Sequence, residues 1–254
     1  MSSFSTPAIM LRRTDFGDYD LILTVFTLNR GKLSIIAKSA KKSIKRFSGI
    51  LELFYVLDIV YSSGRGRRLP VLQEAILRQP FSNIRSNVKK TAYASYWAEL
   101  TNEWMEEGER QVHLYRLLFH ALEKLDLDQT PEAALSILFQ MRFMTISGFS
   151  PNLKECSVCR IEMERVKHNR IVFDLGKGSL VCDRCVTRLS GKLSLSKGTI
   201  KQLQWIQNGA LEKAARIRFT PQAMEEGLAF LEAFVPYHLG KEPRSLTFLR
   251  QIRG

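Results

Sequence analysis

The chain runs LILTVFTLNRGKLSIIA from residue 21 to residue 37, and this stretch decides the fold class of its first part. Residues 21–27 are rich in branched and aromatic side chains, a composition typical of β-strands. Asn29, Arg30 and Gly31 follow as a loop in which the glycine can adopt a positive φ, and residues 32–37 supply a second strand. The stretch therefore predicts an antiparallel hairpin.

Three further strands are predicted around this hairpin. Residues 8–13 form a short run that ends in a turn signal, DFGD at positions 15–18. Residues 51–61 alternate with a period of two and present one strongly apolar face, which is the pattern of a half-buried strand. Residues 69–77 form the fifth run. Five strands joined by short turns within about 80 residues predict a small β-barrel.

After Pro80 the pattern becomes that of helices. Apolar and aromatic residues recur three, four and seven positions apart, which predicts amphipathic helices whose rings pack in a core and do not stack on bases. The stripes are Tyr93, Tyr96, Trp97, Leu100 and Trp104; Tyr115, Leu118, Leu122 and Leu125; and Ile137, Met141 and Met144. Thr130 and Thr220, each followed by proline, mark helix starts, and Gly148 marks a helix end. Two later helices are predicted over residues 196–209 and 220–239.

Two pairs of cysteines are the most specific chemical signal in the chain, which has no other cysteine. They are Cys156 and Cys159, then Cys182 and Cys185, with two residues inside each pair and 22 residues between the pairs. Two thiolates on one tight turn can bind a metal ion from one side, and a second turn completes a tetrahedron. Such a site is closed to water and substrate, so we expect a structural Zn²⁺ and not a catalytic one.

Two disulfides or a redox-active dithiol are the alternatives for the same cysteines. The first residues lack the basic and apolar regions of a signal peptide, so nothing indicates an oxidising compartment. No βαβ pattern surrounds either pair, as a thioredoxin-like motif would require. His168 lies between the pairs and could replace one thiolate, but with four cysteines present we expect it at the surface. The zinc site is therefore favoured.

The cysteines belong to a small inserted module. Residues 170–174 and 178–181 predict a β-hairpin that turns at Gly176-Lys177-Gly178. Because helices are predicted before and after it, we expect a zinc ribbon over residues 152–190, inserted in a helical domain of residues 81–254. The barrel domain is predicted over residues 1–80. The expected fold class is α+β with more than one domain.

The charge balance indicates a polyanionic partner. The 254 residues include 38 Lys and Arg against 25 Asp and Glu, a net charge of +13, which suits nucleic acid or an anionic membrane surface. The longest apolar stretch, residues 50–61, is interrupted by acidic residues and too short to span a membrane, so we expect a cytoplasmic protein. Thirteen basic and six acidic residues leave a charge of +7 in the first 80 positions.

The basic residues of the predicted barrel gather in its connections. One cluster lies between the third and fourth strands, and three arginines interleaved with Gly64 and Gly66 form another, where the backbone can approach a phosphate closely. One cluster alone could be a solvated loop, but two on one small barrel favour a phosphate-binding surface. The candidate DNA contacts are Arg12, Arg13, Lys38, Lys41, Lys42, Lys45, Arg46, Arg65, Arg67 and Arg68.

Aromatic residues near the first cluster are candidates for base stacking. Phe47, beside Lys45 and Arg46, is the leading one, and Phe54 and Tyr55 are the others. Bases of any sequence can stack on exposed rings, so such residues would add to phosphate binding. Each of the three could equally belong to the barrel core.

No catalytic constellation is visible, so we expect a protein that is not an enzyme. The chain has neither a phosphate-cradling GxxxxGK motif nor an HExxH motif. His113 and His120 lie two turns apart on a predicted helix without a carboxylate or cysteine nearby in sequence. The densest carboxylate cluster is expected to be a solvated face at a helix end; it comprises Glu103, Glu106, Glu107 and Glu109.

These parts in this order resemble the RecO family of bacterial recombination mediators, over essentially the whole chain. The resemblance rests on IMLRRTDFGDYD at 9–20, TVFTLNRGK at 24–32, AKSAKK at 37–42, the strand at 51–61, the four cysteines and YHLGKEPRS at 237–245. One position departs from the family pattern: Ser39-Ala40 stands where a glycine often precedes the basic pair.

The resemblance implies an N-terminal five-stranded OB-fold β-barrel followed by an α-helical domain with an inserted four-cysteine zinc ribbon. It implies binding of single- and double-stranded DNA, annealing of complementary strands, action with RecR in DNA repair, and help to the RecA recombinase in replacing single-strand-binding protein. The acidic tail of that protein is an implied partner, with Arg116, Lys124 and Arg142 as candidate contacts. A nucleic-acid-processing enzyme that uses the ribbon as a clamp and a scaffold for acidic proteins are the competing hypotheses.

Overall fold

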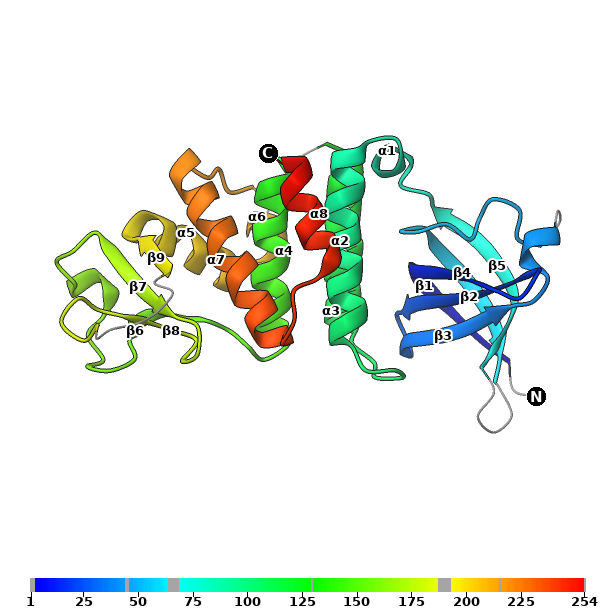
Figure 1. Ribbon diagram of the computed structural model, residues 1–254, viewed down its shortest axis with the longest axis horizontal. Helices are drawn as coiled ribbons and strands as arrows, with labels where there is room; N and C mark the ends of the chain where they lie inside the picture. The colour runs from blue at the N-terminus through cyan, green and yellow to red at the C-terminus, as the bar shows by residue number, and fades with distance from the viewer. Residues whose placement is uncertain are drawn as a thin grey trace. The chain divides into compact units, whose positions relative to one another are not determined.

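A computed structural model describes residues 3–43, 46–63, 69–128, 130–186, 193–214 and 216–253 of the chain (Figure 1). The chain forms two compact units. The first contains Met1–Leu127 together with Pro243–Gly254, and the second contains Asp128–Glu242. Among the described residues, no helix is long and apolar enough to cross a membrane.

A closed five-stranded barrel begins the first unit (Figure 1). Its strands are β1 Ser3–Phe16, β2 Asp20–Thr27, β3 Gly31–Ala37, β4 Val56–Ser62 and β5 Val71–Gln79. They follow one another around the barrel in the order β1-β2-β3-β5-β4, and β1 closes it by pairing with β4. All pairs are antiparallel except the short parallel contact of β3 with β5. This is the five-stranded barrel predicted from the sequence, and its closure removes the exposed sheet edges.

The β2–β3 hairpin turns where the sequence predicts it. Thr27 pairs with Gly31, and the Thr27 hydroxyl donates to the Gly31 carbonyl while accepting the N–H of Arg30. Gly31 has a φ of 67°, in the left-handed region that favours glycine. A Cβ at this position would also lie 1.8 Å from the carbonyl oxygen of Glu109. Both the turn and the close approach of residue 109 therefore require glycine.

The predicted strand over residues 51–61 is wrong in its first part. The strand β4 begins only at Val56, and residues 51–55 form a turn in which Phe54 has a φ of 70°. The turn is held to β1, because Phe54 N–H donates to the Met10 carbonyl and Met10 N–H donates to the Tyr55 carbonyl. Leu51 and Tyr55 are nevertheless buried in the barrel core. Burial does not alternate in this turn, because Leu53 is exposed whereas Phe54 and Tyr55 are both buried. The period-two pattern of the sequence does not distinguish such a turn from a strand.

The α-helices of the first unit, among the residues that the structure describes, are α1 Ser82–Arg85, α2 Val88–Trp104, α3 Val112–Asp126 and α8 Arg244–Arg253. In the stripe of α2, Tyr93, Tyr96 and Trp97 are fully buried, so the predicted role of these rings as core is confirmed. Helix α8 was not predicted from sequence. It packs on α2, and the Glu99 carboxylate accepts its first backbone N–H groups, from Arg244 and Ser245.

The second unit is helical with a small sheet. Its helices are α4 Glu132–Ile146, α5 Lys197–Asn208, α6 Leu211–Ala214 and α7 Pro221–Leu239. The sheet contains β6 Asn152–Cys156, β7 Arg170–Asp174, β8 Ser179–Val181 and β9 Leu193–Ser196, in the order β6-β8-β7-β9. The predicted β7–β8 hairpin is confirmed, with Gly178 at a φ of 59°. The short strands β6 and β9 were not predicted.

Local signals explain the helix ends of this unit. Thr220 accepts the N–H of Ala223 and precedes Pro221, as predicted, and Ser196 caps α5 in the same way. Gly148 follows α4 with a left-handed φ of 86°, and its N–H donates to the carbonyl of Thr145. A glycine in this conformation is a common helix end. At the start of α4 the cap residue is Pro131, one position later than the predicted Thr130.

Candidate metal centre and basic surface of the barrel

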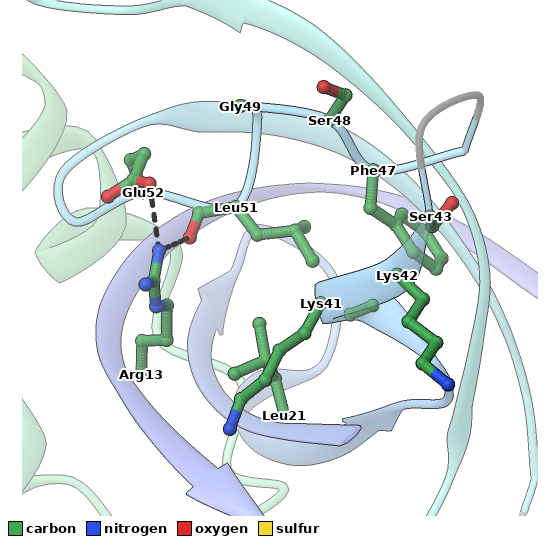
Figure 2. A pocket seen from close by; sticks show the side chains of 11 residues that line it. Arg13, Leu21, Lys41, Lys42, Ser43, Phe47, Ser48, Gly49, Leu51 and Glu52 are labelled. Carbon is green, nitrogen blue, oxygen red and sulfur yellow. Dashed lines mark hydrogen bonds and ion pairs between the residues drawn. The ribbon is translucent and has the colours of Figure 1, made fainter. Parts of the chain in front are cut away.

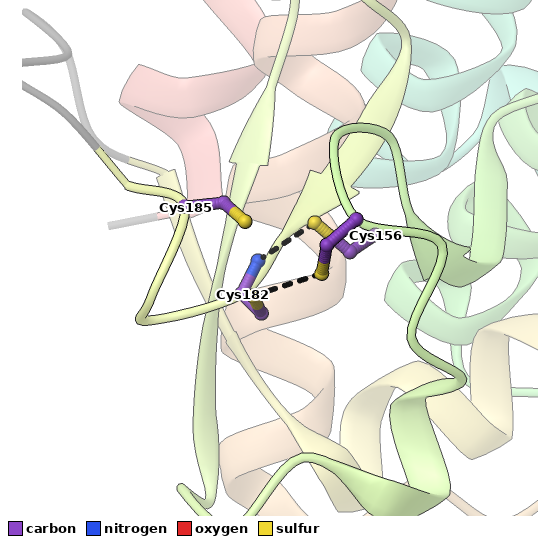
Figure 3. Close-up of side chains that lie close together, drawn as sticks. Cys156, Cys182 and Cys185 are labelled. Atoms are coloured by element: carbon purple, nitrogen blue, oxygen red, sulfur yellow. Dashed lines mark hydrogen bonds between the residues drawn. The ribbon is translucent and has the colours of Figure 1, made fainter.

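The four cysteines come together at the edge of the small sheet. Cys156 and Cys159 lie at and after the end of β6, and Cys182 and Cys185 follow β8. Because β6 and β8 are parallel neighbours, their ends bring the two turns side by side. All four Sγ atoms lie within 4.8 Å of one another (Figure 3). All four cysteines are free thiols, so the disulfide alternative is not what the structure holds.

Backbone N–H groups point at the sulfur of Cys156. Val158 N and Cys182 N each lie 3.4 Å from its Sγ. Burial raises the pKa of Cys156, but backbone donors from Cys159, Cys182 and Val158 lower it, and the pKa is about 6. Hydrogen bonds to the charged form favour a thiolate, which is the form that binds metals.

The crowding of the thiols also suits a cation. The Sγ atoms of Cys159 and Cys182 are 3.6 Å apart, and contacts with Cys159 and Cys182 raise the pKa of Cys185 to about 12. Sulfurs this close oppose one another's ionisation, and a positive ion held by all four removes that opposition. The four clustered cysteines could therefore bind one metal ion. His168 stays at the surface as expected, with its side chain 67% exposed and paired with Asp183.

Several of the predicted DNA contacts gather at one end of the barrel. Arg13 from β1 and Lys41 and Lys42 from the short helix η1 (Ala40–Lys42) line a pocket of about 260 Å³ (Figure 2). Its apolar lining comes from Leu21, Ala40, Phe47 and Leu51. Lys38, just after β3, and Arg12 on β1 are exposed. Lys45, Arg65, Arg67 and Arg68 lie outside the described residues.

Acidic residues already engage part of this charge. Arg13 donates to Glu52 at 2.8 Å, and Arg85 lies 3.7 Å from the same carboxylate. Lys41 pairs with Asp15 at 2.9 Å. Exposed pairs of this kind contribute little to stability, so phosphates can compete for the same cations. Arg46 differs, because its guanidinium packs over the Phe47 ring and donates to the carbonyls of Leu72 and Gln73.

The exposed rings at this end are not the ones named from sequence. Phe47, Phe54 and Tyr55 are only 3%, 3% and 8% exposed. Phe47 and Tyr55 belong to the barrel core, the alternative that the sequence left open, and Phe54 is buried as well. Phe16 and Tyr19, at the β1–β2 turn, are 51% and 45% exposed instead. A signal for them was present in the sequence: Tyr19 lies in the turn and Phe16 directly precedes its glycine, where a ring has little core to enter.

The three residues named for an acidic tail do not share one unit. Arg116 and Lys124 lie on α3 in the first unit, and Arg142 lies on α4 in the second. Arg116 is exposed. Arg142 is half-buried, and its guanidinium donates to the carbonyl of Gly209; burial lowers its pKa. Arg142 is therefore committed to a bond within its own unit.

A closed five-stranded barrel with cations gathered at one end suits a nucleic-acid-binding protein. The family model for the recombination protein O N terminal matches residues 1–81, and that for the recombination protein O C terminal matches residues 85–247. The chain belongs to the RecO family.

Curated relatives agree with this assignment over nearly their full lengths. The DNA repair protein RecO of Desulfosudis oleivorans is 45% identical over 258 residues, covering 100% of this chain and 99% of that protein. The DNA repair protein RecO of Desulfatibacillum aliphaticivorans is 43% identical, covering 100% and 98%. That of Syntrophus aciditrophicus is 32% identical, covering 99% and 97%. Membership makes the chain a non-enzymatic recombination mediator of DNA repair and implies DNA binding.

Proposed function

We propose that the chain binds single- and double-stranded DNA through the basic end of its barrel. The observation that carries the proposal is the gathering of Lys38, Lys41, Lys42 and Arg13 around one end of a closed barrel. Cations that contact phosphates supply affinity for any sequence, because phosphates are the same at every position. Arg12 neighbours Arg13 on β1. The predicted contacts Lys45, Arg65, Arg67 and Arg68 belong to this proposal on sequence grounds alone.

DNA binding of this kind supports strand annealing and exchange of single-strand-binding protein for RecA. Two complementary strands repel each other through their phosphates, and a surface that neutralises both lowers the barrier to pairing. No bond is made or broken, so no acid, base or nucleophile is required. One member of the carboxylate cluster has a structural role, because Glu107, just after α2, accepts the N–H of Ser34 in β3 at 2.7 Å.

The metal ion proposed for the cysteine site is a structural Zn²⁺. Four thiolates on two turns complete the tetrahedral coordination of the ion and leave no position for water or substrate. Such a site is structural and not catalytic. The sheet that carries the site packs on α7, where Phe173 lies 4.7 Å from Phe230 and 5.6 Å from Phe234, between ring centres. This packing supports the proposal that residues 152–190 form a ribbon inserted in a helical domain of residues 81–254, which follows a barrel domain of residues 1–80.

RecR and the acidic tail of single-strand-binding protein are the proposed protein partners, in the bacterial cytoplasm at the nucleoid. For the tail, Arg116 on α3 is the favoured contact because it is exposed. Lys124 lies about two turns further along the same helix, so one extended acidic segment can reach both. Arg142 is the weakest candidate, since its guanidinium already donates to Gly209.

An annealing assay tests the proposal. Complementary oligonucleotides are mixed with and without single-strand-binding protein, in the absence of nucleotide and added metal. The triple variant Lys38→Glu, Lys41→Glu, Lys42→Glu should lose annealing. A matched control reverses the exposed Lys177, Lys201 and Lys213 of the second unit, which changes the net charge equally and should keep annealing. Equal activity of both triple variants would remove the barrel end as the annealing surface.

A further inference from the structure

We propose that the β1–β2 turn is a stacking platform for unpaired bases, with Tyr19 as the principal ring and Phe16 as a second one. This inference rests on the proposed DNA-binding function and assigns the residues that would let the surface favour single strands. The ligand is the nucleobase of a single-stranded DNA, held while its phosphates contact the neighbouring lysines.

The Tyr19 ring is exposed although a lysine covers part of it. The Lys42 ammonium nitrogen lies 3.3 Å from the ring centre, and Tyr19 still exposes 45% of its surface. An ammonium group sits over one face of an aromatic ring, so the exposure of Tyr19 leaves ring surface available to a base. Phe16, three positions earlier, exposes 51%. Single exposed apolar residues are common, but two rings at one short turn beside several cations are not explained by packing.

Two hydrogen bonds hold the turn that carries Tyr19 next to the segment that carries the lysines. Lys41 N–H donates to the carbonyl of Tyr19 at 3.0 Å, and Ser39 N–H donates to the Asp20 carboxylate at 2.7 Å. These two bonds join the β1–β2 turn to the segment that carries Lys38, Lys41 and Lys42. A base stacked on Tyr19 therefore lies beside fixed positive charges, which is the combination of ring and cation that single-strand binders use.

The acidic residues of the turn are accounted for. Asp15 pairs with Lys41, and Asp20 accepts the N–H of Ser39. Asp18 is exposed at the tip. The platform therefore has Lys42 and Lys38 as its readily available cations, and Lys41 becomes available when a phosphate displaces Asp15.

The platform predicts a specific split between substrates. In duplex DNA the base faces are covered by their stacked neighbours, whereas an unpaired base can present its face to Tyr19. Tyr19→Ala should weaken binding of single-stranded DNA about tenfold or more and leave duplex binding within about twofold. Lys42→Ala should weaken binding of both forms, because both carry phosphates.

The sharpest test compares a single-stranded oligonucleotide with an abasic one of the same length and charge, by fluorescence anisotropy on the full chain. The wild type should prefer the oligonucleotide that has bases, and Tyr19→Ala should lose most of that preference. Tyr19→Phe, which keeps the ring, should retain it. Ile76→Ala is the matched control, because Ile76 is 56% exposed on β5 of the same barrel and cannot stack.

Retention of the full preference by Tyr19→Ala would overturn the platform. If the triple lysine variant still lost binding in that case, the proposed DNA surface would stand without the platform. If the triple lysine variant also bound normally, both proposals would fail. The Tyr19→Ala, Phe16→Ala double variant should show less preference than Tyr19→Ala alone, and an unchanged value would remove Phe16 from the platform.

Discussion

The guanidinium of Arg13 lies 2.8 Å from the carboxylate of Glu52 at the rim of the basic pocket (Figure 2). The same carboxylate is 3.7 Å from Arg85. One acid thus restrains two cations next to the proposed path of DNA, and among the described residues it is the only acidic one that lines this pocket.

Glu52→Gln should therefore strengthen DNA binding. Freeing Arg13 for a phosphate adds about one contact, so the slope of log affinity against log salt should steepen by about 0.7 for single strands. The cost in stability should be small, roughly 0–1 kcal/mol, because both partners are partly exposed. Titration at several salt concentrations measures the slope, and chemical unfolding measures the stability. An unchanged slope would mean that Arg13 does not reach DNA when released.

Removal of one cysteine should abolish metal binding without abolishing DNA binding. Elemental analysis of protein purified without chelator should find about one Zn²⁺ per chain, as expected for one four-thiolate site. Cys182→Ser should lose the metal and expose residues 156–186 to protease, because the two turns are no longer joined. DNA binding should persist, since the basic barrel end lies in the other compact unit.

Two results would contradict that account of the cysteines. A metal-free wild type would remove the zinc proposal. Loss of DNA binding in Cys182→Ser, with the barrel still folded by circular dichroism, would mean that the ribbon itself contacts DNA. His168→Ala serves as the control, because His168 is exposed and should leave the metal content unchanged.

The Glu226 carboxylate gives the second unit a pH dependence. Burial raises its pKa, but bonds from the Thr199 hydroxyl, the Ser196 N–H and the Gln222 amide outweigh burial and lower the pKa to about 2. A depressed folded-state pKa stabilises the fold above the unfolded value of about 4.5, and this contribution is lost as pH falls from about 4.5 towards 2.

Glu226→Gln should remove that dependence. At pH 7 the variant should be less stable by on the order of 2 kcal/mol, and its difference from the wild type should shrink as the pH falls from about 4.5 to about 3. Urea unfolding at each pH measures the difference. Glu225→Gln is the matched control, because the neighbouring Glu225 is exposed. If the difference in unfolding free energy between the variant and the wild type stayed constant with pH, Glu226 would stabilise the unit through packing and not through its charge.

The order of elements and the cysteine site were predictable because their signals are local. The hairpin over residues 21–37 depends on strand composition and one glycine, and the cysteine site depends on spacing alone. Helix α8 was not predictable from its own residues, because its start is fixed by Glu99, more than a hundred positions earlier. The strand was also predicted to start too early, at Leu51, for a reason that lies outside its own residues. Leu51 is buried because the end of the barrel closes around it.

The assignment of exposed rings also depended on closure of the barrel. Phe47 lies beside the basic cluster in sequence, but its ring enters the core under Arg46. Tyr19 lies in a turn rich in aspartate, and only the fold places it against Lys42. Sequence spacing located the cations within their loop, but not the face of the barrel that each side chain would reach.

The salt dependence of DNA binding tests the central claim most directly. The triple variant Lys38→Glu, Lys41→Glu, Lys42→Glu should bind single-stranded DNA more weakly, and the slope of log affinity against log salt should be shallower by about 2, at about 0.7 for each lost contact. The control with Lys177, Lys201 and Lys213 reversed should keep the slope of the wild type. Equal slopes for the wild type and the Lys38, Lys41 and Lys42 variant would contradict the assignment of DNA binding to this end of the barrel.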